Sequence, residues 1–219
     1  MPLSAAPQLV IFDCDGVLVD SEPITNQILV DNLARYGLQV SLADCMTLFV
    51  GGTMRGVETR ARELGADLPK DWIDEIYGDI YARLRQGLPS VRGIEAVLDR
   101  LEAADIPYCV ASNGSEEKME ITLGATGLAR RFEGSRFSAH TLGVAKPDPR
   151  LFLIAAEKMG GDAAHAAVIE DSPTGAKAAA RAHIPCFGYA EHDDGARLAA
   201  EGAYVFHDMA DLPALLRLP

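Results

Sequence analysis

Five short apolar runs, separated by segments of helical character, constrain the fold of this chain most strongly. The runs cover residues 9–12, 107–111, 167–169, 185–189 and 203–206. Strands that alternate with helices pair mainly in parallel, because each helix carries the chain back to the start of the next strand. Helices then cover both faces of the sheet. The sequence therefore predicts an α/β fold with a doubly wound parallel sheet.

The segment of residues 20–87 differs from the rest because it contains no convincing strand. Ser21 is a candidate helix cap, with Pro23 in the first turn of the helix. An apolar stripe at helical spacing follows further on, at Ile73, Ile76, Ile80 and Leu84. We therefore expect an all-helical domain of residues 20–87, inserted into a sheet domain made of residues 1–19 and 88–219.

The charge balance narrows the range of partners. Acidic residues exceed basic residues by 32 to 20, and the formal net charge at pH 7 is -12. Such a chain repels a polyanionic backbone, so we expect no nucleic-acid partner. The N-terminal apolar stretch is short, lacks a basic flank and runs straight into Asp13, unlike a signal peptide. No segment approaches the ~20 apolar residues of a membrane span, so we expect no membrane partner.

The cysteines give no sign of a metal site or a disulfide framework. They are scattered, without ligand-spaced pairs, at Cys14, Cys45, Cys109 and Cys186. We expect reduced, mostly buried thiols, which favours a cytoplasmic location. The five histidines also lack metal-ligand spacing. The sequence leaves open whether the protein is a monomer or a homodimer.

Two carboxylates, Asp13 and Asp15, directly follow the first apolar run and flank Cys14, with Gly16 next. Charges at the edge of a core are costly unless a cation or a reaction uses them. Open α/β sheets bind ligands at the carboxyl ends of their strands, so the pair marks a candidate active site. A strand-end turn with solvated aspartates would explain the same pattern.

A second candidate motif, Ser112-Asn113-Gly114, follows the second apolar run. A hydroxyl group and unpaired backbone N–H groups between a strand and a helix that starts near Ser115 form a small anion cradle. The same three residues also make an ordinary turn. The motif gains weight only in combination with the others.

A third motif centres on Lys146, which precedes Pro147. Proline favours an extended backbone in the residue before it, so the lysine is held at a defined place. Asp148 and Pro149 are expected to form the N-cap and first position of the next helix. A solvated loop lysine is the alternative interpretation.

A fourth motif places two adjacent acids, Glu170 and Asp171, at the end of the third apolar run. Ser172 is expected to cap the next helix, with Pro173 at its start. Carboxylates suit Mg²⁺, which also prefers water and phosphate oxygens. All four motifs are expected at one edge of the same sheet, and this joint order is far more specific than any single motif.

The stretches FDCDGVLVDSE, SNG, AKPDP and EDSPTG extend over nearly the whole chain. Through them the sequence resembles the haloacid dehalogenase superfamily, in the subfamily with a helical cap inserted after the first strand. The likeness is greatest to 6-phosphogluconate phosphatase-like and β-phosphoglucomutase-like members. The resemblance implies a Rossmann-like core, a helical cap domain and Mg²⁺-dependent hydrolysis of small phosphate monoesters, such as sugar or sugar-acid phosphates.

The resemblance also implies catalytic roles. Asp13 would attack phosphorus to form an aspartyl phosphate, and Asp15 would protonate the leaving alkoxide and later deprotonate water. Lys146 would screen Asp13 from the incoming phosphate. The groups that bind the phosphate would be those of Lys146 and Ser112 and the backbone N–H groups of Asn113 and Gly114.

Mg²⁺ is the cofactor that the resemblance implies. Its ligands would come from Asp13, the backbone carbonyl of Asp15, and Asp171, while Glu170 would bind through water. Without the cation, the acidic cluster would repel an anionic substrate. The resemblance thus implies a metal site made of Asp13, Asp15, Glu170 and Asp171.

Substrate specificity is harder to place. Gly51, Gly52 and Arg55 lie at a turn between helices of the insert, where the resemblance puts specificity residues, and Arg55 is a candidate ligand for a second anionic group. Lys118 follows the phosphate loop by one helical turn and is a second candidate. A solvated helix surface is the alternative, and the simpler, explanation for both residues.

Four other functions fit the sequence less well. A sugar phosphomutase would need a histidine in the first cap helix, and residues 20–87 contain none. A dehalogenase needs no proton donor for its halide, so Asp15 argues against it. A phosphoacceptor signalling domain does not suit the helical insert. A dinucleotide-binding domain lacks its GxGxxG motif after a strand.

Overall fold

A computed structural model describes residues 3–49 and 53–219 of the chain. Two compact units are present, one of Met1–Asp20 with Pro89–Pro219 and one of Ser21–Leu88. Each junction lies one residue later than the domain boundary expected from the sequence. The chain leaves and re-enters the first unit at neighbouring points, because Asp20 N donates to Pro89 O (3.1 Å) and Val91 N to Leu18 O (3.1 Å).

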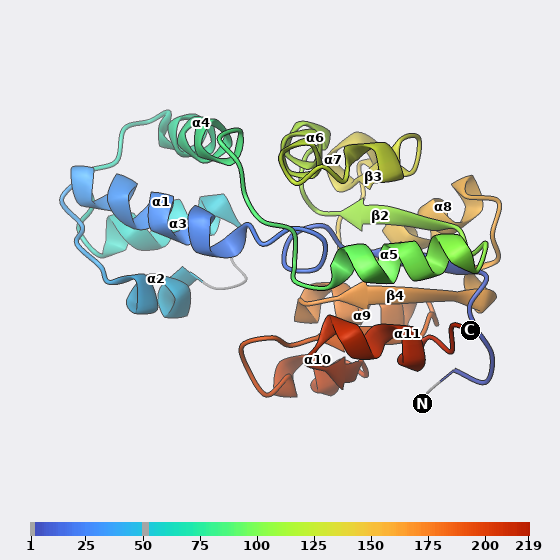
Figure 1. Ribbon diagram of the computed structural model, residues 1–219. Coiled ribbons are helices and arrows are strands. Elements are labelled where there is room, and N and C mark those ends of the chain that lie inside the picture. The colour runs from blue at the N-terminus through green and yellow to red at the C-terminus, as the bar shows by residue number, and fades with distance from the viewer. Residues whose placement is uncertain (1–2, 50–52) are drawn as a thin grey trace. The chain divides into compact units, whose positions relative to one another are not determined.

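The first unit contains a six-stranded sheet in the order β3-β2-β1-β4-β5-β6, and every pairing is parallel (Figure 1). The strands are β1 (Leu9–Phe12), β2 (Tyr108–Ser112), β3 (Arg136–Ser138), β4 (Ala166–Glu170), β5 (Cys186–Tyr189) and β6 (Tyr204–Phe206). The predicted doubly wound parallel sheet is thus confirmed. The sequence analysis missed β3, because three residues that begin with an arginine carry no periodic pattern.

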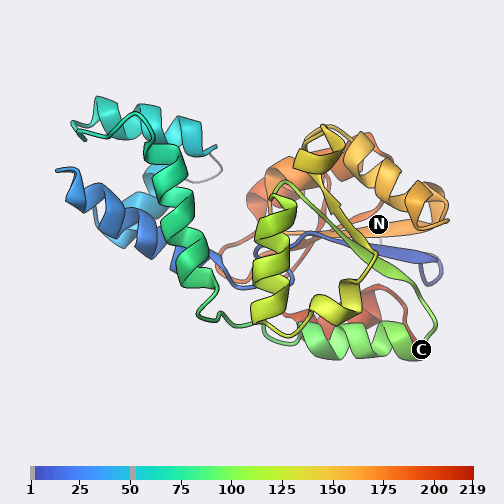
Figure 2. The same ribbon diagram turned by 90° about the horizontal axis from the view of Figure 1, so that it is seen from above.

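Helices cover both faces of this sheet. One face carries α5 (Ile94–Ala103) and α11 (Leu212–Leu215), while the other carries α8 (Arg150–Lys158) and α9 (Pro173–Arg181) (Figure 2). The unit also contains α6 (Glu116–Ala125), α7 (Ala139–Leu142) and α10 (Ala196–Ala200). With both faces covered, the loops that follow the strands lie together at the carboxyl edge of the sheet.

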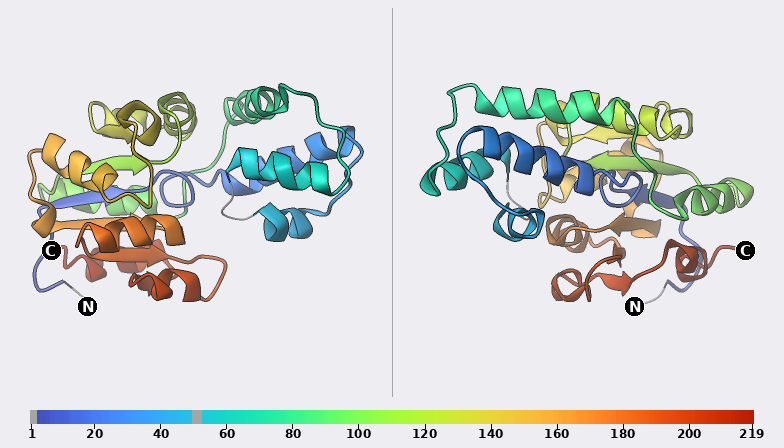
Figure 3. Two further views of the ribbon diagram at one scale, coloured as in Figure 1. Left: turned by 180° about the vertical axis from the view of Figure 1, so that it is seen from behind. Right: turned by 60° about the vertical axis from the view of Figure 1, so that its left-hand side comes forward.

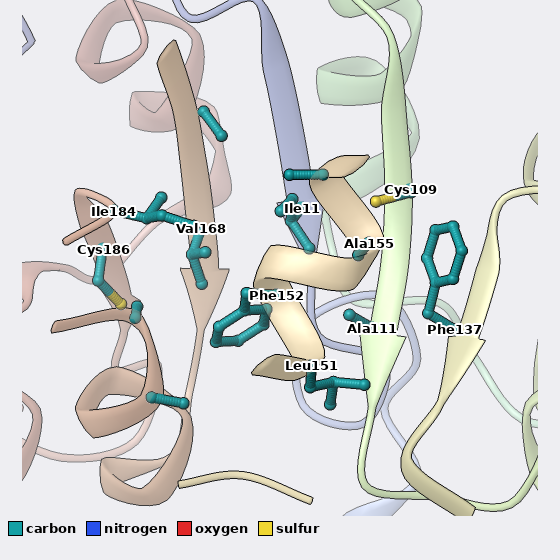
Figure 4. Packing of buried hydrophobic residues seen from close by; sticks show 14 of the residues in the cluster. Ile11, Cys109, Ala111, Phe137, Leu151, Phe152, Ala155, Val168, Ile184 and Cys186 are labelled. Atoms are coloured by element: carbon teal, nitrogen blue, oxygen red, sulfur yellow. The ribbon is translucent and has the colours of Figure 1, made fainter. Parts of the chain in front are cut away.

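The central strand β1 is buried along its whole length. Ile11 faces α8 and packs in a cluster with Phe152 and Val168 (Figure 4). Phe12 packs edge-on against Tyr108, with ring centroids 6.2 Å apart. A strand covered on both faces is rigid, so the residues that follow it are held in fixed positions.

The described residues of the second unit form helices joined by loops, with no strand among them (Figure 3). Its helices are α1 (Glu22–Arg35), α2 (Leu42–Phe49), α3 (Met54–Glu63) and α4 (Trp72–Leu84). Ile76, Ile80 and Leu84 of the predicted stripe are buried, and Trp72 donates from Nε1 to Asn32 Oδ1 at 2.6 Å. Trp72 therefore serves as a packing residue of this unit.

The structure shows how the helices α9, α1 and α8, whose first residues the sequence predicted, begin. Ser172 caps α9 by accepting a hydrogen bond from Gly175 N at 3.0 Å, as expected. Ser21 occupies the position before α1, but its backbone is helical and its side chain forms no cap, so that prediction was wrong. Helix α8 begins at Arg150, one residue later than expected, because Pro149 is the N-cap and its carbonyl accepts the first helical hydrogen bond, from Leu153 N (3.1 Å).

The four cysteines are free and buried, in agreement with the sequence analysis.

Across residues 3–49 and 53–219, no helix combines the length and apolar character needed to cross a bilayer.

Candidate active site

Three of the four motifs meet within the first unit because β2 and β4 flank β1 in the sheet. Asp13 extends the ladder beyond β1, donating from its N–H to Ile169 O at 2.9 Å. Ser112 ends β2 and Glu170 ends β4. These three loops share the carboxyl edge of the sheet, where parallel α/β proteins bind ligands.

Lys146 lies between two buried carboxylates. Its Nζ is ion-paired with Asp13 and lies 2.5 Å from Glu170 Oε1. The side chains of Lys146, Asp13 and Glu170 are only 3%, 12% and 0% exposed, so the charges interact with little solvent screening. The same Nζ lies 5.1 Å from the centroid of the Phe152 ring, a cation–π contact from α8.

The lysine is held in place by a side chain of the phosphate-loop motif. Asn113 Oδ1 accepts a hydrogen bond from Lys146 N at 2.8 Å, and Asn113 Nδ2 donates to Lys146 O at 3.3 Å. The sequence analysis assigned only the backbone of Asn113 to the site. No local pattern predicts this clamp, since the two residues are far apart in the sequence.

Burial and neighbouring charges shift the pKa values of this group in opposite directions. Burial raises the pKa of Asp13 from 3.8 to about 7, against the effect of Lys146 and with that of Glu170. Burial would lower the pKa of Lys146, but the two carboxylates raise it above its ordinary range. The positive charge of Lys146 therefore does not fully offset the effect of burial and of the neighbouring acids on Asp13.

Asp13, Glu170 and Asp171 form a cluster that fits a divalent cation. One oxygen from each carboxylate lies within 4.8 Å of the others. Glycines make room for it: a Cβ at Gly16, where φ is +74°, would lie 2.0 Å from Asp171 Oδ2, and one at Gly175 would lie 1.8 Å from Glu170 Oε1. Hard oxygen donors in this number suit Mg²⁺.

Glu170 is anchored on both oxygens. Lys146 occupies Oε1, while Oε2 accepts from Ser172 N (3.0 Å) and Ser172 Oγ (2.8 Å). Ser172 thus serves the helix and the acidic cluster at once. The sequence analysis recognised only its cap role, although its position two residues after the acid was a usable signal.

Asp15 lies apart from this cluster. Its Oδ2 pairs with Lys118 Nζ at 2.8 Å, and the two side chains are 25% and 21% exposed. Burial would lower the pKa of Lys118, but the Asp15 carboxylate raises it above its ordinary range. The two aspartates of the first motif therefore have different environments and different cationic partners.

The phosphate-loop motif is ordered by its own hydrogen bonds. Ser112 is buried, and its Oγ accepts from Gly114 N at 3.0 Å. Ser138, at the end of the unpredicted strand β3, donates from Oγ to Gly114 O at 2.8 Å. The Gly114 N–H of the expected anion cradle is therefore occupied by the Ser112 hydroxyl group in this structure.

The residues predicted to set substrate specificity lie in different units. Lys118 belongs to the first unit and contacts Asp15. Arg55 is exposed near the start of α3 in the second unit, and its role stays a prediction. Gly51 and Gly52 lie outside the described residues.

The parallel sheet and the lysine-braced acids at its carboxyl edge define the class of the protein: an α/β enzyme with a site suited to a hard cation and an anionic group. The sequence profile of the haloacid dehalogenase-like hydrolases matches residues 7–183. The chain belongs to this family. The family, the fold and the hydrolytic enzyme expected from the sequence are thereby confirmed.

Similar proteins cover the chain nearly end to end. It is 28% identical to 6-phosphogluconate phosphatase of Escherichia coli, over 95% of this chain and 94% of the relative. It is 33% identical to phosphoglycolate phosphatase of Agrobacterium fabrum, over 94% of this chain and 91% of the relative. A solved hydrolase of the family from Deinococcus radiodurans, with bound phosphate and sodium, has a TM-score of 0.83 at 30% identity, covering 97% of this chain and 96% of that one.

Proposed function

We propose that this protein is a Mg²⁺-dependent phosphatase that hydrolyses small phosphate monoesters through an aspartyl phosphate at Asp13. The observation that carries the proposal is the position of Lys146, buried between Asp13 and Glu170 beside Asp171. The names of the curated relatives support the phosphatase class. The phosphate and sodium bound by the solved relative support a site that accepts an anion together with a cation.

In the first half of the proposed reaction, an Asp13 oxygen forms a bond to phosphorus while the ester P–O bond breaks. The Asp15 carboxyl group gives its proton to the departing oxygen, which leaves as the alcohol. Asp15 suits this task because its side chain stays outside the carboxylate cluster and is partly exposed. Splitting the reaction matters, since phosphate monoesters are among the slowest compounds to hydrolyse unaided.

In the second half, the Asp15 carboxylate removes a proton from water, and the water oxygen bonds to phosphorus. The P–O bond to Asp13 breaks, which restores the Asp13 carboxylate and releases inorganic phosphate. Asp15 regains its proton in the same step, so the residues return to their starting state. Lys146 remains charged throughout, because its raised pKa keeps the ammonium form at neutral pH.

The transferring phosphoryl oxygens would be bound by Lys146, the Ser112 hydroxyl and the backbone N–H groups of Asn113 and Gly114. The Gly114 N–H would exchange its hydrogen bond to Ser112 Oγ (3.0 Å) for one to the substrate. The cation would be held by Asp13, Asp171 and the Asp15 carbonyl, with Glu170 through water, and would neutralise charge on the phosphoryl oxygens. Because Asp13 has a pKa of about 7, positive charge at this cluster also favours its ionised, nucleophilic form.

The substrates we propose are sugar or sugar-acid phosphates, in line with the names of the curated relatives. We assign the helical unit, residues 20–87 in the sequence analysis, the role of a cap that carries specificity, with Arg55 as a candidate ligand. We place the enzyme in the cytoplasm. A phosphomutase is the second candidate, and the absence of histidine from residues 20–87 weighs against it.

A screen of phosphorylated metabolites with the purified protein and Mg²⁺ tests the proposal, with released phosphate as the readout. Asp13→Asn should abolish turnover and leave the circular dichroism spectrum unchanged, whereas Asp99→Asn, an exposed surface control, should be fully active. EDTA should inactivate the enzyme and Mg²⁺ should restore it.

Multiple turnovers by Asp13→Asn would refute the nucleophile assignment. Full activity after exhaustive chelation would remove the metal from the scheme. With a hexose 1-phosphate, formation of the 6-phosphate in place of free phosphate would establish the mutase.

A further inference from the structure

The ion pair between Lys118 and Asp15 is a feature of the site that the proposed chemistry leaves unexplained. Asp15 must move protons, yet a cation lies 2.8 Å from its Oδ2. Both side chains are only partly exposed, at 25% for Asp15 and 21% for Lys118, so the contact is stronger than an ordinary surface ion pair.

The sequence around Lys118 disfavours a cation at this place. Lys118 lies in the first turn of α6, where the helix dipole favours acids, and Glu116 and Glu117 follow that rule. The backbone is fixed nevertheless, because Ser115 Oγ accepts a hydrogen bond from Lys118 N at 3.1 Å. A residue that breaks a local rule is expected to be compensated elsewhere, and for Lys118 the compensation is its ion pair with Asp15.

One turn further along α6, Thr122 contacts the residue next to Asp15. Thr122 is fully buried, and its Oγ1 lies 3.8 Å from Cys14 Sγ. The same hydroxyl donates to Lys118 O at 3.0 Å. Two successive residues of the nucleophile loop, Cys14 and Asp15, are therefore held by two residues on the same face of α6.

Each of the two aspartates thus pairs with a different lysine. Lys146 pairs with Asp13 inside the carboxylate cluster, and Lys118 pairs with Asp15 outside it. Gly114 lies beside the second pair: a Cβ there would make ordinary van der Waals contacts with Lys118 Cδ (3.6 Å) and Asp15 Oδ2 (3.9 Å). The ion pair with Lys118 restrains the flexible Asp15 carboxylate, which is not part of the cluster of Asp13, Glu170 and Asp171.

We propose that Lys118 is a positioning residue that holds the Asp15 carboxyl group beside the metal cluster and out of it, where it can meet the leaving oxygen of the substrate. The inference rests on the proposed phosphatase function. It gives Lys118 a role through Asp15, in place of the direct substrate contact considered from the sequence. Misplacing a reacting group by about 1 Å is enough to cost on the order of 100-fold in rate.

The test compares Lys118→Met with Lys177→Met, a helix lysine of the same unit that pairs with Glu201 at 3.4 Å. Three substrates separate the possible roles. Glycerol 2-phosphate releases a poor leaving group and has no second anion, phosphoglycolate adds a carboxylate, and p-nitrophenyl phosphate releases an acidic phenol that needs no proton donor.

For Lys118→Met we expect kcat/KM to fall on the order of 100-fold with both alkyl phosphates and to change little with p-nitrophenyl phosphate. Lys177→Met should leave all three values unchanged. An equal loss on all three substrates would reduce Lys118 to a structural residue. A loss confined to phosphoglycolate would make it a substrate ligand, and either result, or no loss at all, overturns the proposal.

A crystal structure of Lys118→Met grown with Mg²⁺ gives a readout that does not depend on turnover. The Asp15 carboxylate should move by about 1 Å or more from its position in the parent protein under the same conditions. An unmoved carboxylate overturns the inference. If the parent protein hydrolyses none of the three esters, the proposed function fails by itself, and this comparison still decides the positioning role.

Discussion

Replacing Lys146 by methionine tests how the acidic cluster is held together. The substitution nearly keeps the length of the side chain but removes its charge, and it leaves two carboxylates that are 12% and 0% exposed. Breaking a buried ion pair by removing one partner costs about 3–5 kcal/mol, because the remaining charge stays desolvated. Two like charges remain here, so we expect the free energy of unfolding to fall by at least about 3 kcal/mol at pH 8 without divalent cations.

Urea unfolding followed by far-ultraviolet circular dichroism measures this loss. Fluorescence alone is unsuitable, because Trp72, the single tryptophan, belongs to the other unit. The matched control is Lys177→Met, whose ion pair with Glu201 has side chains 42% and 30% exposed, and it should cost at most about 1 kcal/mol. Equal losses in the two variants would refute the reasoning.

The pH dependence gives an independent check. Burial raises the folded-state pKa of Asp13 to about 7, so its contribution to stability is complete below 3.8 and is lost as the pH rises through about 7. Removing Lys146 takes away the charge that lowers this pKa, which raises it further. The deficit of Lys146→Met should therefore be largest above pH 7 and shrink toward pH 5. A deficit independent of pH would point to lost packing on Phe152 instead.

Two further predictions concern the edges of the site. In Gly175→Ala the new Cβ would lie 1.8 Å from Glu170 Oε1, so the Glu170 carboxylate should be displaced. We expect a loss of about 1.5–3 kcal/mol in the free energy of unfolding and weaker Mg²⁺ binding, measured by calorimetry. The control Gly124→Ala, which has open space around it, should be neutral or slightly stabilising. Unchanged Mg²⁺ affinity in Gly175→Ala would contradict this. Arg55→Ala should raise KM for substrates with a second anionic group and leave kcat nearly unchanged, and identical kinetics across such a panel would dismiss Arg55 as a ligand.

The sequence predicted the elements that carry long apolar runs. The four apolar residues Leu9–Phe12 form a fully buried strand. The strand ends at Phe12 because the acids begin at the next residue. The short edge strand Arg136–Ser138 was not predicted, because three residues are too few to show an alternating pattern even though Phe137 and Ser138 are buried. Its end nevertheless supports the phosphate loop through Ser138.

For the site, the sequence analysis identified the residues but not their partners. Asp13, Lys146 and Glu170 were named from separate motifs, and the parallel sheet brings them together. The pairing of Lys118 with Asp15 depends on how α6 packs beside the first loop, which no spacing along the chain encodes. Such contacts between distant segments emerge only from tertiary packing.

The junction between the two units has a consequence for the history and the engineering of this scaffold. The outgoing and returning segments are hydrogen-bonded neighbours, since Asp20 N reaches Pro89 O. An insertion whose two ends meet in this way disturbs no strand order, so it is tolerated like a long surface loop. A helical unit of different shape can therefore take the place of Ser21–Leu88, while the strand order of the sheet and the acidic cluster at its carboxyl edge stay the same.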